Sequence, residues 1–198
     1  DPDRLRAVAE DFIKHYETRV AEGATVAGKA MFVCSNRNIA YDFYKIVKEL
    51  RPEWTEKKIC DDGVVLSEKD KKELKPMEKI KLVMTRNKDD EKDLFDMLGT
   101  KEDRKEFDRQ FKNPKSNFKI AIVVDMWLTG FDVPELDTIY IDKPIQQHTL
   151  IQTISRVNRV CEGKDKGLIV DYIGIKKNMN TALKKYTNFE SEEFEGVE

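Results

Sequence analysis

A five-residue apolar run, Ile-Ala-Ile-Val-Val at 120–124, constrains the fold of this chain more than any other feature. A strand that is apolar at every position has no polar face to offer to water, so both of its faces must be covered. Parallel sheets with helices on both sides meet that requirement. The run therefore predicts an α/β domain built on a mostly parallel sheet.

The rest of the chain has the alternation of strands and helices that such a sheet needs. Apolar residues spaced every three or four positions indicate helices, and short apolar runs bounded by turn residues indicate strands. The charge-rich stretch 55–79 fits neither pattern, and we expect a strand or loop there. We expect helices over 4–22, 37–50, 89–98, 101–112 and 148–161, and strands over 29–34, 80–84, 120–124, 138–141 and 167–172.

Composition excludes several classes of protein. The formal net charge of -2 argues against a uniformly basic nucleic-acid binder, although a local basic strip remains compatible with it. The three cysteines form no CxxC pair, which fits a reducing compartment rather than a disulfide scaffold. His15 and His148 are far apart, so we expect no metal site. No apolar run approaches the roughly 18 residues that span a bilayer, and we expect no membrane partner.

The predicted helix at 148–161 places a polar group opposite an apolar stripe. At about 100° per residue, Gln152, Arg156 and Arg159 share one face. The opposite face carries an apolar stripe of Leu150, Ile154, Val157 and Cys161. Arginines held on a buried helix can clamp phosphate oxygens, as an arginine finger does. The alternative is an amphipathic surface helix with two solvated arginines.

Polar loops follow three of the predicted strands, at 35–37, at 85–87 and after Val124. The carboxyl ends of parallel strands meet at one edge, where ligands bind in such sheets. Thr129 and Gly130 offer a hydroxyl and backbone N–H groups to a phosphate, and Asp132 could accept hydrogen bonds from a ribose or position an arginine. Taken singly, each loop also fits ordinary turn chemistry.

Several of these segments resemble helicase motifs. Thr-Gly-Phe-Asp-Val-Pro at 129–134, followed by Gln-x-x-Ser-Arg-x-Asn-Arg within 152–159, looks like motifs V and VI of superfamily 2 helicases. Phe-Val-Cys-Ser-Asn-Arg at 32–37 is similar to motif IV. More narrowly, 124–134, 141–159 and 163–174 resemble the restriction (R) subunit of type I restriction–modification enzymes. The close resemblance covers about 124–175, and a looser one covers 29–50.

The resemblance implies a three-layer RecA-like domain of the P-loop NTPase type that lacks its own P-loop. It would be the second of two motor domains that hold ATP and Mg²⁺ between them and translocate double-stranded DNA. The missing first domain would hold most of the ATP and Mg²⁺. We expect a linker helix at 1–28, the RecA-like domain at 29–174, and the start of a helical region with an acidic tail at 175–198.

The resemblance also assigns roles to individual residues. Arg156 and Arg159 would reach the γ-phosphate, with Arg159 as the finger. Gln152 and Asp132 would support that interface. The expected contacts with DNA are Thr129 and Gly130 from motif V, Ser35 and Arg37 from motif IV, and Thr85 after the next strand.

The implied partners are the first motor domain and the nuclease domain of the same parent chain, and the methyltransferase and specificity subunits. The implied location is the cytoplasm of a bacterium or archaeon. The chain begins with neither Met nor a signal peptide, so we expect it to be part of a longer protein. We also expect it to be inactive alone as an ATPase and as a nuclease.

One sequence pattern is a decoy for a phosphate loop. Residues 23–30 nearly fit G-x-x-x-x-G-K-[ST], but Ala30 has no hydroxyl for Mg²⁺, and a helix precedes the pattern where a strand should. Asp142, Glu162 and Lys164 can be forced into a nuclease pattern, which arises by chance in a chain that is 37% charged. Two other functions stay open: the second motor domain of a different superfamily 2 enzyme, and a non-catalytic α/β module that binds a protein.

Overall fold

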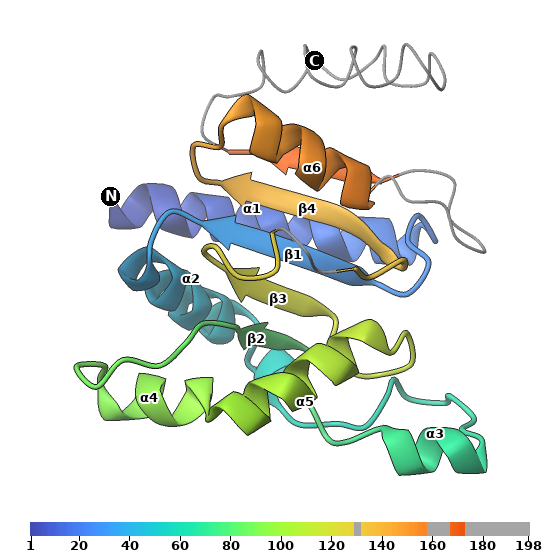
Figure 1. Ribbon diagram of the computed structural model, residues 1–198. Coiled ribbons are helices and arrows are strands. Elements are labelled where there is room, and N and C mark those ends of the chain that lie inside the picture. The colour runs from blue at the N-terminus through green and yellow to red at the C-terminus, as the bar shows by residue number, and fades with distance from the viewer. Residues whose placement is uncertain (129–131, 158–166, 173–198) are drawn as a thin grey trace.

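The computed structural model describes residues 1–128, 132–157 and 167–172, and its strands form a five-stranded sheet in the order β2-β3-β1-β4-β5 (Figure 1). Every strand pair in it is parallel, which confirms the predicted α/β class. The strands are β1 Lys29–Cys34, β2 Ile80–Leu82, β3 Ile120–Val123, β4 Leu136–Asp142 and β5 Leu168–Asp171. The helices are α1 Pro2–Ala21, α2 Arg37–Leu50, the 3-10 turn η1 Pro52–Thr55, α3 Glu68–Glu73, α4 Lys92–Leu98, α5 Lys101–Lys112 and α6 Gln147–Val157.

The sheet separates two apolar cores, so the domain has three layers. Alternate residues of β1 point to opposite faces, and all six of its residues are buried. Phe32 packs with α1 and α2 on one face, and Val33 packs with α5 and α6 on the other. All four residues of β3 are buried as well, as their apolar character predicted.

Helix α1 belongs to the first of these cores. Phe12 is completely buried, with its ring centroid 4.8 Å from that of Tyr140 and 5.1 Å from that of Phe32. At the start of the helix, Arg4 donates to both carboxylate oxygens of Asp142, at 2.6 and 3.2 Å. The helix expected to act as a linker thus shares its core with the sheet.

The charge-rich stretch after α2, where we expected a strand or loop, contains a short helix with a solvated face, as its mixed charge from Ser67 to Lys81 indicates. In α3, Ser67 and Asp70 form a capping box, each side chain bonding the backbone N–H of the other. None of the residues in α3 is buried, so no apolar stripe marks it. Around it the chain runs as loops joined by one isolated bridge between Lys58 and Met77.

The connection from β3 to β4 also departs from regular alternation. Because these strands are parallel, the chain must return from the carboxyl end of β3 to the amino end of β4. A helix usually makes this return, whereas residues 124–128 and 132–135 are turns and loop. Leu128 and Val133 are buried in the second core and anchor the two described ends of this connection.

Candidate functional site at the carboxyl edge of the sheet

The three polar loops predicted to converge do lie at one edge of the sheet. Strands β2, β3 and β1 are neighbours and parallel, so their carboxyl ends share the edge at the left of Figure 1. β4 pairs with β1 in the same direction and brings Lys143 to this edge too. Loops from four strands therefore meet where ligands bind in open parallel sheets.

Arg37, at the start of α2, ties the loop after β1 to the loop after β2. Its guanidinium donates to both carboxylate oxygens of Asp90 at 2.7 Å and to the backbone oxygen of Thr85 at 2.6 Å. Burial alone would raise the pKa of Asp90, but the Asn87 amide and Arg37 outweigh it and hold that pKa below its ordinary value. Thr85 itself is exposed.

Ser35 connects the ends of β1 and β4. Its hydroxyl donates to the backbone oxygen of Asp142 at 3.0 Å. Arg4, which grips the carboxylate of Asp142, also donates to the backbone oxygen of Tyr172 at 2.9 Å. The end of β4 is thereby held from both sides, which orients the loop that carries Ser35.

Lys143 connects the ends of β4 and β3. Its ammonium donates to the backbone oxygen of Val124 at 3.0 Å and to the carboxylate of Asp125. Two residues further on, Trp127 has a φ of 68°, a left-handed conformation that is a genuine outlier for a bulky side chain. Its ring stacks on Phe111 with centroids 5.3 Å apart. Such strain persists only where the surroundings enforce it.

The residues predicted to follow in this loop are only partly described. Thr129 and Gly130 lie outside the described residues. Asp132 is exposed, at the point where the described chain resumes.

Helix α6 is seated as its pattern predicted. Leu150, Ile154 and Val157 are buried in the second core, and Gln152 is exposed. Arg156 lies on the described helix, while its side chain and all of Arg159 lie outside what the structure describes.

Gly167, just before β5, lies against Val157 of α6. A Cβ atom at Gly167 would lie 2.1 Å from the backbone oxygen of Val157. Only glycine allows the chain before β5 to pass this close to Val157.

The decoy phosphate loop is not a phosphate site in the structure. Gly28 precedes β1, and the Lys29 ammonium is buried, donating to the backbone oxygen of Phe118 at 2.5 Å. A phosphate-loop lysine must instead face the nucleotide. The carboxylate of Asp142 is occupied by Arg4 rather than set for nuclease chemistry. Within the described ranges, no group of three or more His, Cys, Asp or Glu side chains could hold a metal ion.

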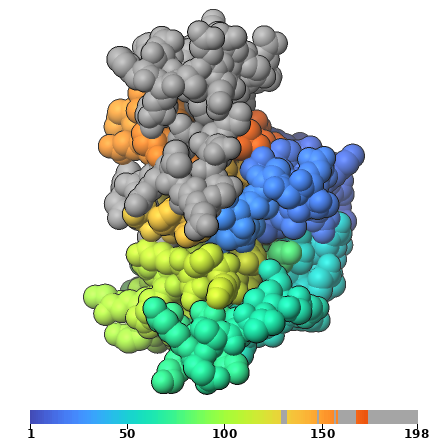
Figure 2. Space-filling model, turned by 90° about the vertical axis from the view of Figure 1, so that its right-hand side faces the viewer, coloured from blue at the N-terminus to red at the C-terminus, as the bar shows by residue number. Residues whose placement is uncertain are grey.

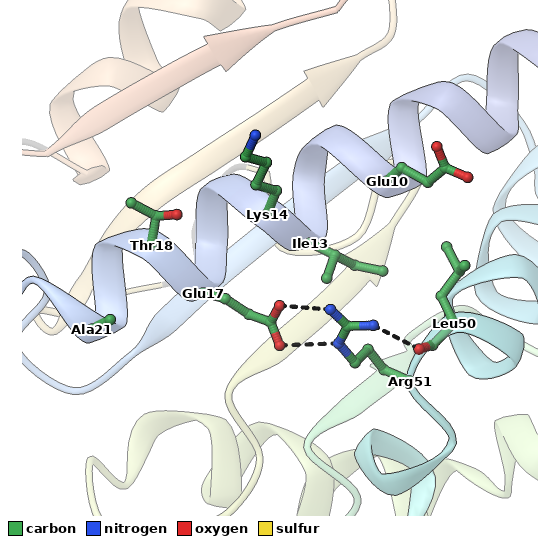
Figure 3. Close-up of a pocket in the computed structure, with 8 residues that line it drawn as sticks. All are labelled: Glu10, Ile13, Lys14, Glu17, Thr18, Ala21, Leu50 and Arg51. Carbon is green, nitrogen blue, oxygen red and sulfur yellow. Dashed lines mark hydrogen bonds and ion pairs between the residues drawn. The ribbon is translucent and has the colours of Figure 1, made fainter.

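A pocket of about 490 Å³ lies away from this edge, between α1 and the end of α2 (Figure 3). In Figure 3, Arg51 grips the carboxylate of Glu17 through hydrogen bonds of 2.8 and 3.0 Å. The Arg51 hydrogen bond is the main cause of the lowered pKa of Glu17. The pocket thus contains a satisfied ion pair, and we assign it no chemistry.

Sequence reasoning missed the partners that organise the edge. Asp90, Lys143 and Gly167 carry no local signal, because each acts on a residue 10 or more positions away along the chain. Only the strand order, which brings their loops together, makes them visible.

Comparison with known families places this domain. The model of the family described as type I restriction enzyme subunit R domain 3 matches residues 26–174. The chain is 39% identical over 189 residues to the type I restriction enzyme HindI endonuclease subunit of Haemophilus influenzae, covering 94% of this chain and 16% of that protein. It is also 39% identical over 187 residues to the putative type I restriction enzyme MjaIXP endonuclease subunit of Methanocaldococcus jannaschii, covering 94% and 15%.

Solved structures agree on the fold. A fragment of a putative HsdR subunit of a type I restriction enzyme from Vibrio vulnificus superposes with a TM-score of 0.58 at 16% identity, over 90% of this chain and 30% of that one. Domain 2 of the DEAD-box helicase Mss116p, bound to an RNA duplex, superposes with a TM-score of 0.50 at 15% identity, over 94% and 56%. In the described ranges no helix is long and apolar enough to cross a membrane. The chain spans about one sixth of the curated relatives' length, and it belongs to the type I restriction enzyme subunit R domain 3 family.

Proposed function

We propose that this chain is the second motor domain of an ATP-dependent double-stranded DNA translocase, the R subunit of a cytoplasmic type I restriction–modification system. The observation that carries the proposal is the cross-tied carboxyl edge: Arg37, Ser35 and Lys143 join loops from four strands beside a helix whose polar face bears Gln152. A motor that presses this edge against a partner domain needs such a stiff surface.

In this proposal Arg156 and Arg159 complete a nucleotide site in the missing first domain. Bound ATP with Mg²⁺ supplies the phosphoryl group whose transfer to water drives translocation. The role of this chain is to present the positive charge of its arginines to the γ-phosphate, from a helix anchored by Leu150, Ile154 and Val157. Gln152 and Asp132 would support that interface in this proposal, and both are exposed.

The proposed ATP site is shared between two domains, and this chain supplies only the side that contacts the γ-phosphate. The Lys29 ammonium is buried against a backbone oxygen, so residues 23–30 cannot cradle phosphates. A domain that lacks the cradle but presents a polar helix face fits the second half of a shared nucleotide site rather than the first.

We assign the DNA track to Ser35, Arg37, Thr85, Thr129 and Gly130. The Arg37 guanidinium already donates two hydrogen bonds to Asp90. A DNA phosphate would therefore either share the guanidinium with that carboxylate or displace the carboxylate from it. The Ser35 hydroxyl would turn from the Asp142 oxygen to donate to a phosphate. DNA would thus contact the same side chains that join the loops of this edge, which links the track to the nucleotide edge.

The proposed partners follow from the same assignment. They are double-stranded DNA, the first motor domain and the nuclease domain of the parent chain, and the methyltransferase and specificity subunits.

The test is Arg159→Ala in the full-length subunit, with ATP turnover measured on DNA. Loss of an arginine finger lowers turnover by about 10³-fold or more, because the transition-state charge is left unpaired. Arg109→Ala is the control, since Arg109 is an exposed residue of α5 that pairs with Glu106 on the same helix. If the Arg159→Ala variant kept ATP turnover within about tenfold of the unmodified subunit, Arg159 would have a structural role and the arginine-finger assignment would be refuted.

A further inference from the structure

Lysines line up along the opposite, amino edge of the sheet. Ala30, Ile120 and Ile80 are paired across β1, β3 and β2, and the residue just before each of them is a lysine. The three are Lys29, Lys119 and Lys79. Positive charge therefore collects at the end of the sheet that the proposed motor chemistry does not use.

Two of these lysines, Lys79 and Lys119, line a pocket of about 450 Å³ together with the acidic residue Asp61. The Lys119 side chain is only 7% exposed, and the Asp61 carboxylate, 3.6 Å away, is 58% exposed. The Lys79 ammonium lies 5.2 Å from the centre of the Trp54 ring. Burial is the main cause of the lowered pKa of both lysines, because removing an ammonium from water is costly. For Lys119, the Asp61 carboxylate and the Pro114 backbone oxygen, 3.3 Å from the ammonium, offset part of that cost. Lys115 also lines the pocket, but its ammonium is already paired with the Asp70 carboxylate at 2.7 Å.

Apolar side chains surround the same pocket. The described residues include five exposed large apolar side chains: Val20, Val26, Ile59, Val64 and Val65. Val20, Val26 and Val64 line the pocket, and Ile59 and Val65 belong to the loop that supplies Asp61 and Val64. Figure 2 looks onto this edge, where the end of α1 (blue), the 59–66 loop (cyan to green) and the segment before β3 (yellow-green) come together.

A surface of this kind fits a protein partner better than a free anion. Clustered exposed apolar residues mark interaction sites, and buried cations beside them select carboxylates. The curated relatives extend well beyond this region, since the chain spans only 16% and 15% of their length. The rest of such a parent polypeptide is therefore the candidate to cover this surface.

We propose that this amino-edge surface, centred on Lys79, Lys119 and Val64, docks another domain of the same parent polypeptide through a segment in which carboxylates flank apolar side chains. The carboxylates enter beside Lys119 and Lys79, and the apolar side chains cover Val64 and Val65. The proposal rests on the chain being part of a longer R subunit, and does not depend on the arginine finger.

Zero-length carbodiimide cross-linking of the full-length subunit, read by mass spectrometry, tests this. Lys115 and Lys119 should join to Asp or Glu residues outside 1–198, while Lys92, 88% exposed on α4, should not. Links from Lys115 and Lys119 confined to Asp61 and Asp70 would overturn the proposal.

A second measurement separates docking from folding. Val64→Asp with Val65→Asp should leave the melting temperature of this chain alone unchanged, because both residues are exposed. In the full-length subunit it should lower the yield of those cross-links by about tenfold, as buried like charges disfavour contact. An unchanged yield would rule out this surface. ATP turnover is recorded separately, so failure of the motor assignment remains distinguishable.

Discussion

At the scale of single residues, Gly167 sets the position of the helix that carries the proposed arginines. Gly167→Ala places a methyl group against the backbone oxygen of Val157, which cannot move without shifting α6. We expect the free energy of unfolding to fall by roughly 1–3 kcal/mol, as overpacking does elsewhere, when measured by urea denaturation.

Gly23→Ala is the matched control for that change. Gly23 has a φ of 67° with nothing within 4 Å of an added Cβ, so the substitution costs only conformational strain, about 1 kcal/mol. In the full-length subunit, Gly167→Ala should also lower ATP turnover whereas Gly23→Ala should not. If Gly167→Ala and Gly23→Ala changed stability and ATP turnover equally, α6 would tolerate the displacement that the added methyl group causes.

Asp90 makes part of the stability depend on pH. Its pKa is lower in the folded chain than in the unfolded one, so its contribution is complete above the unfolded pKa of about 4 and is lost as pH falls through the folded value. Asp90→Asn should therefore cost roughly 1–2 kcal/mol at pH 7 and progressively less below pH ~4 in urea denaturation.

Asp62→Asn provides the comparison, because that side chain is 95% exposed and its nearest cation, Lys58, is 3.9 Å away. It should change stability little at either pH. A cost of Asp90→Asn that stays constant down to pH 3 would contradict the role given to the Arg37 pair.

At the scale of elements, α1 is as much a part of the core as the strands are. Phe12 contacts five other aromatic rings, from α1, α2, η1, β1 and β4. Phe12→Ala should cost roughly 3–5 kcal/mol, a large share of the 5–15 kcal/mol typical of a domain. Thermal unfolding followed by circular dichroism measures the loss.

Lys14→Ala on the exposed side of the same helix should be nearly neutral. If Phe12→Ala proved equally mild, α1 would be a dispensable linker after all.

Local patterns in the sequence predict most elements closely, because helices and strands here have strong periodicity or caps. The α2 bounds are those predicted, and Asn36 caps the helix by accepting from the Ile39 amide at 2.9 Å. The loops on either side of α3 have no such pattern, because long-range bonds hold them, such as that from the Asn117 side chain to the Met77 oxygen at 2.7 Å. The insertion of β3 between β1 and β2 likewise has no local signature.

At the scale of the whole molecule, the chain alone should be inactive. Its arginines have no phosphates to act on, so we expect purified chain to release no phosphate from ATP, with or without DNA, in a phosphate-release assay. Phosphate release that Arg159→Ala abolishes would refute the division of the nucleotide site between two domains.

Binding to double-stranded DNA should be weak and salt-dependent in the same preparation, because one domain offers half a track and a net charge of -2. Arg37→Ala should reduce the slope of log affinity against log salt by about one, the share of a single phosphate contact. An unchanged slope would leave Arg37 as a purely internal tie to Asp90.

The two tryptophans of the chain fall on opposite faces of the sheet. Trp54 is buried with α1 and α2, and Trp127 packs on Phe111 beside the loop that leads to Thr129. The protein thus contains two built-in fluorophores with separate surroundings. In a Trp54→Phe variant, all tryptophan emission would come from the strained loop, which would report its motion in real time as nucleotide and DNA are added.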